Sequence, residues 1–141
     1  MKQKAVILSI IMLFFCLCSC KNAPTEQNFT LYIETPQTNV KVGDTVTYTA
    51  VLRNNTEDDF TLTHGIPLIT VYICSEEQNT EHSSVGMALA QTNLEGNDVI
   101  RKQYNAELLE AGRYKLVVYC GFSIENKDFY YRLDDILIEV K

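Results

Sequence analysis

The chain has 141 residues, 46% of them hydrophobic, and carries a formal net charge of −6. This length fits one domain with a core of ordinary size, and the apolar content is that of a folded protein and not of a disordered chain. The negative charge disfavours nucleic acid as a partner and leaves no basic patch for anionic lipid.

The N-terminus has the pattern of a secretory signal peptide. Lys2 and Lys4 form a short basic stretch, and an apolar run follows over residues 5–17, interrupted only by Ser9. As a helix with a rise of about 1.5 Å per residue, this run would be about 20 Å long. A bilayer core of about 30 Å requires about 20 apolar residues. We therefore expect a cleaved signal over residues 1–19 and not a permanent membrane span.

The signal ends in the sequence LCSC, from Leu17 to Cys20. It resembles the lipobox of bacterial lipoproteins, in which a Leu stands three residues before an invariant Cys and small residues lie between them. The resemblance implies cleavage between Ser19 and Cys20 and diacylglyceryl transfer to the Cys20 thiol. The protein would then be anchored in the cell membrane by lipid and face the extracytoplasmic side, on the outer membrane if the host has one. Cys16 and Cys18 would leave with the signal, as small hydrophobic residues within it.

A polar stretch, KNAPTEQN, occupies residues 21–28. We interpret residues 20–28 as the lipidated Cys20 and a tether, and residues 29–141 as one folded domain. At about 3.3 Å per residue, residues 21–28 reach at most about 25 Å, so the domain would stay close to the bilayer.

From Asn28 onward, apolar and polar residues alternate with a period of two, which is the pattern of half-buried β-strands. Gly43-Asp44 and His64-Gly65 are expected to be turns, and residues 106–111 could continue a strand or form a helical turn. The expected strands are 28–34, 45–53, 60–63, 68–74, 85–92, 99–108, 113–122 and 129–141. Seven or eight short strands joined by polar turns predict an all-β antiparallel sandwich.

Two local motifs sharpen this fold prediction. The segment LLEAGRYKLVV, at residues 108–118, contains Leu-x-x-Gly-x-Tyr just before a strand. It resembles the tyrosine corner of immunoglobulin-like and fibronectin-like domains, which implies a hydrogen bond from Tyr114 back to the backbone near Leu109 or Glu110. The Gly43-Asp44 turn leads into a strand that ends LRNNT, a second feature shared with bacterial Ig-like domains. Over most of residues 29–141 the chain resembles the BsuPI-type Ig-like extracytoplasmic domains. That family is named for a proteinase inhibitor. The resemblance implies the fold of this chain and not an inhibitory activity.

Cys74 and Cys120 are the cysteines outside the signal and the lipid site. An extracytoplasmic location favours disulfides. However, both residues stand at the C-terminal ends of their expected strands, which lie at opposite edges of a sheet if the strands are antiparallel neighbours. Their separation would be about 15–20 Å, whereas a disulfide needs Cα atoms within about 7 Å. We therefore expect two separate small hydrophobic residues and no bridge.

Neither histidine is expected to bind metal. His64 is placed in a turn and His82 in an acidic loop, where solvation is the simpler interpretation. The pairs Asp58-Asp59 and Asp134-Asp135 are a weak signal for calcium, because no ligand-rich loop of the D-x-D-x-D-G kind surrounds them.

The sequence contains no G-x-S-x-G elbow and no phosphate-binding glycine loop, so we expect neither an enzyme nor a small-molecule cofactor. The first hypothesis is an interaction module that binds an envelope protein or other component through loops or a sheet edge. Tyr119, Tyr130 and Tyr131 are either its contact surface or part of the packing on the strand faces. Two alternatives stay open. One is a proteinase inhibitor of the BsuPI type, acting through loops 74–84 or 93–98. The other is a structural subunit, such as a pilus component, assembled by strand addition.

Overall fold

The computed structural model describes residues 23–34, 36–77 and 88–141. The expected signal, Cys20 and His82 lie outside the described residues, so the predictions made for them are untested by the fold. The strands of the described chain are β1 Phe29–Glu34, β2 Asn39–Val40, β3 Thr45–Asn54, β4 Phe60–Gly65, β5 Ile69–Ser75, β6 Leu89–Leu94, β7 Val99–Glu107, β8 Gly112–Ile124 and β9 Lys127–Val140.

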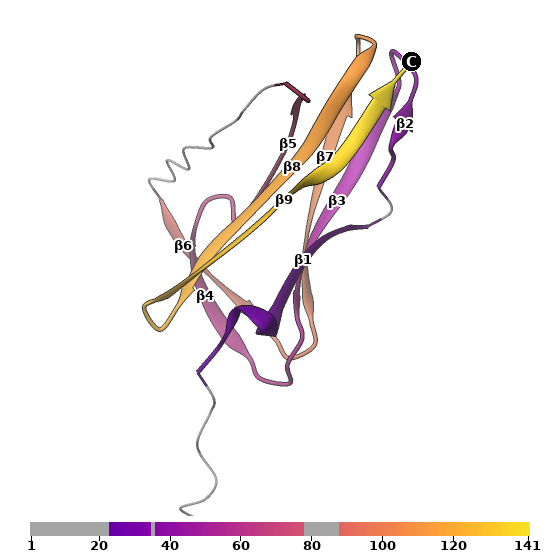
Figure 1. The fold of residues 1–141 in the computed structure, drawn as a ribbon. Helices are drawn as coiled ribbons and strands as arrows, with labels where there is room; N and C mark the ends of the chain where they lie inside the picture. Colours follow the sequence, from indigo (N-terminus) through magenta and orange to yellow (C-terminus); the bar gives the residue numbers. More distant parts are fainter. Residues whose placement is uncertain (1–22, 35, 78–87) are drawn as a thin grey trace, which may run out of the picture.

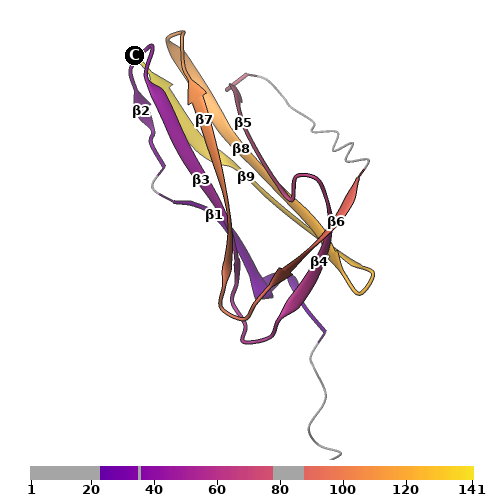
Figure 2. The same ribbon diagram turned by 180° about the vertical axis from the view of Figure 1, so that it is seen from behind.

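These strands form two sheets that pack face to face (Figures 1 and 2). One sheet has the order β1-β3-β7, and the other has the order β2-β9-β8-β4-β6 with β5 also paired to β8. The architecture is an all-β Ig-like sandwich, which confirms the predicted fold class. Two details differ from the prediction. The short strand β2 was not predicted and runs parallel to β9, and β8, with 13 residues, is longer than the expected strand 113–122.

The core lies between the two sheets and follows the period-two pattern. Alternate residues of β3 and β8 point inward because successive side chains of a strand face opposite ways. An aromatic cluster fills one end, where the ring of Phe29 lies 5.1 Å from that of Phe122 and 5.7 Å from that of Phe129. The largest fully buried core side chains are Tyr48, Leu52, Leu62, Leu94, Leu116, Phe129 and Ile138.

β4 and β5 share one edge of β8, but they do not follow it continuously. Thr63 is paired with Ser123, and Ile69 with Cys120. Between these two pairings the chain advances six residues, from Thr63 to Ile69, while β8 advances only three, from Cys120 to Ser123. The additional residues of the β4–β5 connection form a loop that leaves the sheet. In the described chain, Gly121 and Phe122 have no ladder partner on this side. The interruption opens a gap in the outer face of the sheet.

The pairing of β8 with β9 contains a β-bulge. Leu116 is paired with Ile136 and Val118 with Leu133, so Val117 alone faces Asp134 and Asp135. The extra residue lies in β9 and bends that strand.

Both turn motifs expected from the sequence are present. The Tyr114 hydroxyl donates to the Glu110 carbonyl oxygen at 3.1 Å, as in a tyrosine corner. Gly43 has a φ of 86°, a left-handed conformation that favours glycine, and its N–H donates to the Leu108 carbonyl at 2.8 Å. β7 continues to Glu107, so the helical alternative for residues 106–111 is wrong.

The tyrosine corner gives a first stability prediction. Tyr114→Phe removes one hydrogen bond and leaves the ring in place, so the free energy of unfolding should fall by about 0.5–1.5 kcal/mol. Urea denaturation measures the change. Tyr130→Phe is the matched control, since that side chain is 77% exposed, and it should leave stability unchanged. Equal stability of the Tyr114 variant and the wild type would contradict a stabilising role for the corner.

The folded body begins before β1. A 3₁₀ helix, η1 Glu26–Asn28, precedes this strand, and Pro24 is buried. Lys127 Nζ donates to the Pro24 carbonyl at 2.7 Å, and the Tyr131 hydroxyl donates to the Glu26 carbonyl at 2.9 Å. Residues 24–28 were expected to be free tether. They instead pack on the β8–β9 hairpin, because that hairpin supplies donors for their carbonyls.

Candidate interaction surface

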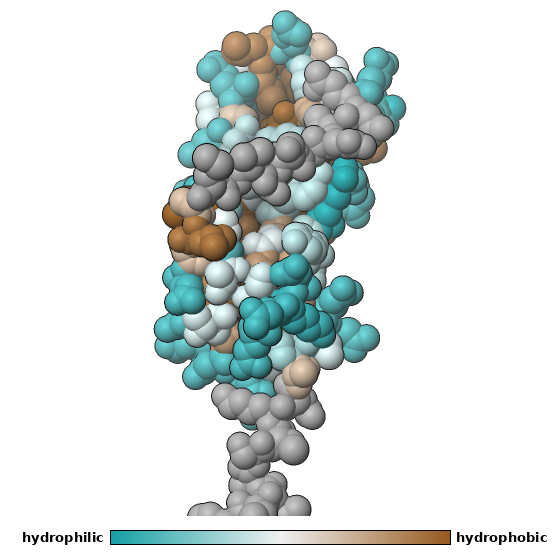
Figure 3. All heavy atoms as spheres, turned by 90° about the vertical axis from the view of Figure 1, so that its left-hand side faces the viewer, coloured by the Kyte–Doolittle hydropathy of each residue, from teal (hydrophilic) through white to brown (hydrophobic). Residues whose placement is uncertain are grey.

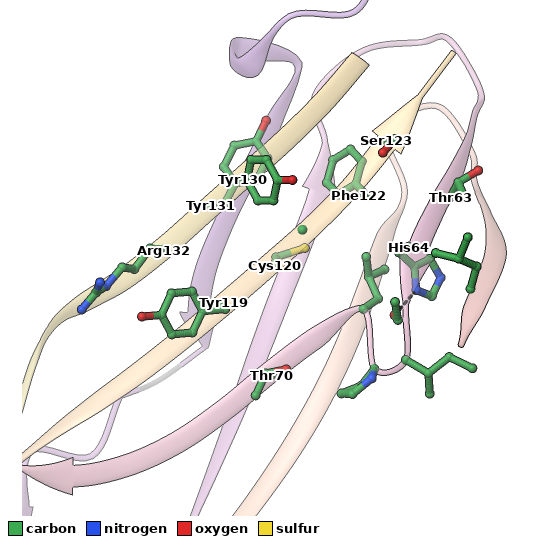
Figure 4. A pocket seen from close by; sticks show the side chains of 16 residues that line it. Thr63, His64, Thr70, Tyr119, Cys120, Phe122, Ser123, Tyr130, Tyr131 and Arg132 are labelled. Atoms are coloured by element: carbon green, nitrogen blue, oxygen red, sulfur yellow. Dashed lines mark hydrogen bonds between the residues drawn. The ribbon is translucent and has the colours of Figure 1, made fainter. Parts of the chain in front are cut away.

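A cavity of about 920 Å³ lies where β4 and β5 separate along β8. Residues of the β4–β5 connection line one side, and residues of β8 and β9 line the other (Figure 4). On β8, the lining residues Tyr119, Gly121 and Ser123 belong to the face that points away from the core. Cys120 and Phe122, which alternate with them, are buried in the core. We call this cavity the groove.

Two tyrosines are held flat on the sheet beside the groove. The ring of Tyr119 stacks on that of Tyr72, with centroids 6.1 Å apart, and the guanidinium of Arg132 lies 5.2 Å from the Tyr119 ring. Tyr130 lies over Gly121: a Cβ atom at position 121 would be 3.3 Å from its ring. The bare glycine thus provides the space for the Tyr130 ring, yet this side chain remains 77% exposed.

Tyr131 has a different role from the other two. Its ring stacks on Phe122 with centroids 6.0 Å apart, and its hydroxyl is bonded to η1. Burial raises the pKa of Tyr131 to about 12, with smaller contributions from Glu26 and Cys120. Of the three tyrosines singled out in the sequence, Tyr130 is therefore the exposed one at the groove, Tyr119 is packed against Tyr72 and Arg132, and Tyr131 packs with the core.

Exposed apolar side chains stand around the groove. Ile66 is 60% exposed, Leu89 77% and Tyr130 77%, and all three line the groove. Figure 3, which faces the β4–β6 side, shows hydrophobic side chains gathered in a patch at mid-height of the molecule. The sequence did not indicate this patch, because Ile66 follows an expected turn and Leu89 lies within the separate expected strand 85–92. The two come together only through the pairing of β4 with β6.

The prediction that His64 lies in a solvated turn is wrong. His64 belongs to β4, pairs with Ala90 of β6 and is 8% exposed. Its Nδ1 lies 2.6 Å from the Gly65 carbonyl oxygen, and its Nε2 lies 2.9 Å from Thr92 Oγ1. A carbonyl only accepts, so this network assigns the proton to Nδ1 and makes Nε2 the acceptor of the Thr92 hydroxyl. Both ring nitrogens are engaged, which disfavours roles as a general base or metal ligand.

Cys74 and Cys120 lie at opposite ends of the β5–β8 pair. Cys120 is paired with Ile69, and Cys74 with Lys115, a separation of five residues, or about 16 Å along the strand. That distance exceeds the reach of a disulfide, about 7 Å between Cα atoms. Burial raises the pKa of the Cys120 thiol to about 12, so this thiol stays protonated and unreactive at neutral pH.

The paired acids do not converge on a common point. Asp59 Oδ1 accepts from the Gly96 N–H at 2.9 Å, and Asp134 forms an exposed ion pair with Arg132 at 2.9 Å. Within residues 23–34, 36–77 and 88–141, no three His, Cys, Asp or Glu side chains form a group that could hold a metal ion. Over the same residues, no helix has the length and apolar character needed to cross a bilayer.

The segment 93–98, considered above as an inhibitory loop, is shorter than expected. β6 extends to Leu94 and β7 begins at Val99, so only residues 95–98 connect them. The Asn97 N–H donates to the Thr56 carbonyl at 2.7 Å, and a Cβ atom at Gly96 would lie 2.2 Å from the Glu57 carbonyl oxygen. The connection is packed on a neighbouring loop and does not protrude. The other candidate, 74–84, extends beyond the described residues.

No protein-family model matches the chain, and no curated protein matches it by sequence. Among solved structures, it is similar to the CARDB domain of the PF1109 protein from Pyrococcus furiosus, solved in complex with di-metal ions. The identity is 14%, over 87% of this chain and 97% of that one, with a TM-score of 0.47. It is also similar to PapD-like domain 7 of human CEP192, at 9% identity over 87% and 92% of the chains and a TM-score of 0.45.

A third similar structure is a β-glucosidase from Listeria innocua in complex with glucose. The identity is 11% and the TM-score 0.43; the match covers 79% of this chain but only 16% of the β-glucosidase. Likenesses of this size carry no inference about ligand or activity.

Proposed function

We propose that this chain is a membrane-anchored extracytoplasmic lipoprotein whose Ig-like domain is a non-enzymatic interaction module. The sequence LCSC at residues 17–20 supports the anchor. The groove supports the interaction role, and one observation carries it: Tyr130 is 77% exposed with its ring against Gly121, and it lines the same groove as the exposed Ile66 and Leu89. Rigid aromatic side chains bury much area on binding at little entropic cost, so they are enriched in protein interfaces.

The chemistry of the groove also favours binding over catalysis. His64 has both ring nitrogens in hydrogen bonds, and the thiol of Cys120 is protonated at neutral pH. Neither group is therefore available as a base or nucleophile. What the groove presents to a partner is the exposed side chains of Ile66, Leu89 and Tyr130, together with Arg132, which is ion-paired with Asp134.

The anchor is tested by Cys20→Ala. This variant should accumulate as unprocessed precursor and should carry no metabolically incorporated fatty acid, because the acceptor thiol is gone. Cys18→Ala is the matched control, since it keeps the expected acceptor, and it should be processed and labelled normally. A Cys20→Ala variant that still takes the fatty-acid label would contradict the proposed anchor.

The interaction role is tested by site-specific photo-cross-linking in intact cells. A benzoyl-phenylalanine at position 130 places the reactive group beside the groove. The same residue at Lys102, an exposed position of β7 in the other sheet, is the control. We expect a discrete adduct from position 130 that is absent from position 102 and is lost when Ile66 and Leu89 are both changed to Asp. Identical adducts from both positions, or none from position 130, would exclude the groove as the contact surface.

A further inference from the structure

We infer that the docked N-terminal segment fixes which end of the sandwich faces the lipid surface. This inference rests on the proposed anchor at Cys20 and extends it to an orientation. The proximal end consists of η1, the loop 54–59, the connection 95–98 and the β8–β9 turn. The distal end consists of the β2–β3 turn, the connection 108–111 and Lys141. Figure 1 shows η1 and the loops of the proximal end at the bottom, and the C-terminus at the top.

The attachment of the N-terminal segment to the proximal end involves several independent contacts. Lys127 Nζ and the Tyr131 hydroxyl bond to the carbonyls of Pro24 and Glu26. The Asn55 N–H donates to the Asn28 carbonyl at 2.8 Å, and Asn55 Nδ2 donates to Thr30 Oγ1 at 2.8 Å. The chain is therefore held to the proximal end from Pro24 onward.

The sequence between Cys20 and the docked segment is short compared with the body. Only residues 21–23 separate Cys20 from the buried Pro24, so at about 3.3–3.6 Å per residue the two lie at most about 14 Å apart. The 14 residues of β9 span about 45 Å along the sandwich at about 3.3 Å per residue. A tether about one third as long as the body keeps the proximal end near the bilayer while Pro24 stays docked, and the distal end can reach the bilayer only if the whole body lies down along its surface.

The charge distribution opposes adsorption of the proximal end to anionic lipid. Its loops carry Glu57, Asp58, Asp59, Glu95, Asp98, Glu125 and Asp128. The single Lys127 among them has its ammonium group hydrogen-bonded to Pro24. Repulsion from anionic lipid acts over a Debye length of about 8 Å at physiological salt. The proximal end is thus held near the bilayer by the lipid on Cys20 and kept off its surface by charge, and the distal end points outward.

The orientation can be measured on the lipidated protein in vesicles. A fluorophore is attached at Glu57→Cys in the proximal end or at Leu109→Cys in the distal end. Both positions are exposed, whereas Cys74 and Cys120 are 8% and 2% exposed and do not compete for the label. Lipids with a nitroxide on the headgroup quench the fluorophore at short range. We expect several-fold stronger quenching at position 57 than at position 109.

The control variant carries an insertion of about 16 Gly and Ser residues between Ala23 and Pro24, which behaves as a flexible chain. It should bring the two quenching efficiencies close together. Equal quenching of the two positions without the insertion would overturn the orientation, and so would a difference that the insertion leaves intact. Mass spectrometry of the same preparation separates the two proposals. If Cys20 carries no acyl group, the anchor fails and the orientation fails with it, whereas an acylated protein with equal quenching overturns the orientation alone.

Discussion

Replacing Phe129 by alanine is expected to lower the free energy of unfolding by about 3–5 kcal/mol. Phe129 is fully buried and joins the cluster at the proximal end of the core. Its ring lies 5.3 Å from that of Phe122 in a stacked arrangement and 5.7 Å from that of Phe29 edge-on. Truncation would remove both contacts and leave a cavity between two sheets that cannot close on it.

The loss is large compared with the total stability of a domain, which is about 5–15 kcal/mol. Phe129→Leu retains most of the volume and should cost less, about 1–1.5 kcal/mol, so the series remains measurable if the alanine variant does not fold. Tyr130→Ala, at the neighbouring exposed position, is the control and should have a small effect on urea unfolding. A Phe129→Ala variant destabilised by less than about 1 kcal/mol would show that this end of the core repacks freely.

The second large effect is expected at Asn54, a fully buried polar residue at the end of β3. Its Nδ2 donates to the carbonyls of Asp58 at 2.7 Å and Glu95 at 3.0 Å. Its Oδ1 accepts from the Thr56 N–H at 3.0 Å and from the Thr56 hydroxyl at 2.8 Å. One side chain therefore satisfies backbone groups in both the loop 54–59 and the connection 95–98.

Asn54→Leu removes these partners and leaves two carbonyls and one N–H without them. We expect the free energy of unfolding to fall by about 2–3 kcal/mol, since four part-buried hydrogen bonds are lost at once. The Thr56 amide should also exchange its hydrogen faster, which NMR measures directly. Asn55→Leu is the control, because that side chain is exposed and bonded to Thr30, and its cost should stay below about 1 kcal/mol. Slow exchange at Thr56 in the Asn54 variant would contradict the bridging role.

The strands could be predicted from the sequence because their signal is local. Alternation in β3 and β8 depends only on which face of a strand is buried, and the tyrosine corner depends on residues four apart. His64 was misplaced although a local signal existed: it stands two residues after the buried Leu62 and so shares its face. The Gly that follows suggested a turn, but pairing with β6 extends β4 through it.

The groove and the docked N-terminal segment could not be predicted in the same way, because both depend on distant residues. The gap beside Gly121 arises from a mismatch in the number of residues between two pairings on one strand. The partners of Pro24 and Glu26 lie 103 and 105 residues away. Neither the mismatch between the two pairings nor these long-range hydrogen bonds produces a periodic pattern in the sequence. The position of Tyr130 over Gly121 could have been inferred only after the tight β8–β9 turn had been located.

The bulge at Asp134-Asp135 affects how readily copies of this protein associate with one another. On the side away from β8, β9 is paired only at Glu139 and Val140, with β2. Most of this 14-residue strand is therefore an edge strand with no strand paired to that side in the described chain. Long, flat edge strands of this kind can pair with an edge strand of another molecule, which leads to aggregation. The bulge bends this edge strand, and the adjacent carboxylates of Asp134 and Asp135 lie near its middle. The same pair that looked like a weak calcium signal thus disfavours edge-to-edge pairing between copies of this domain.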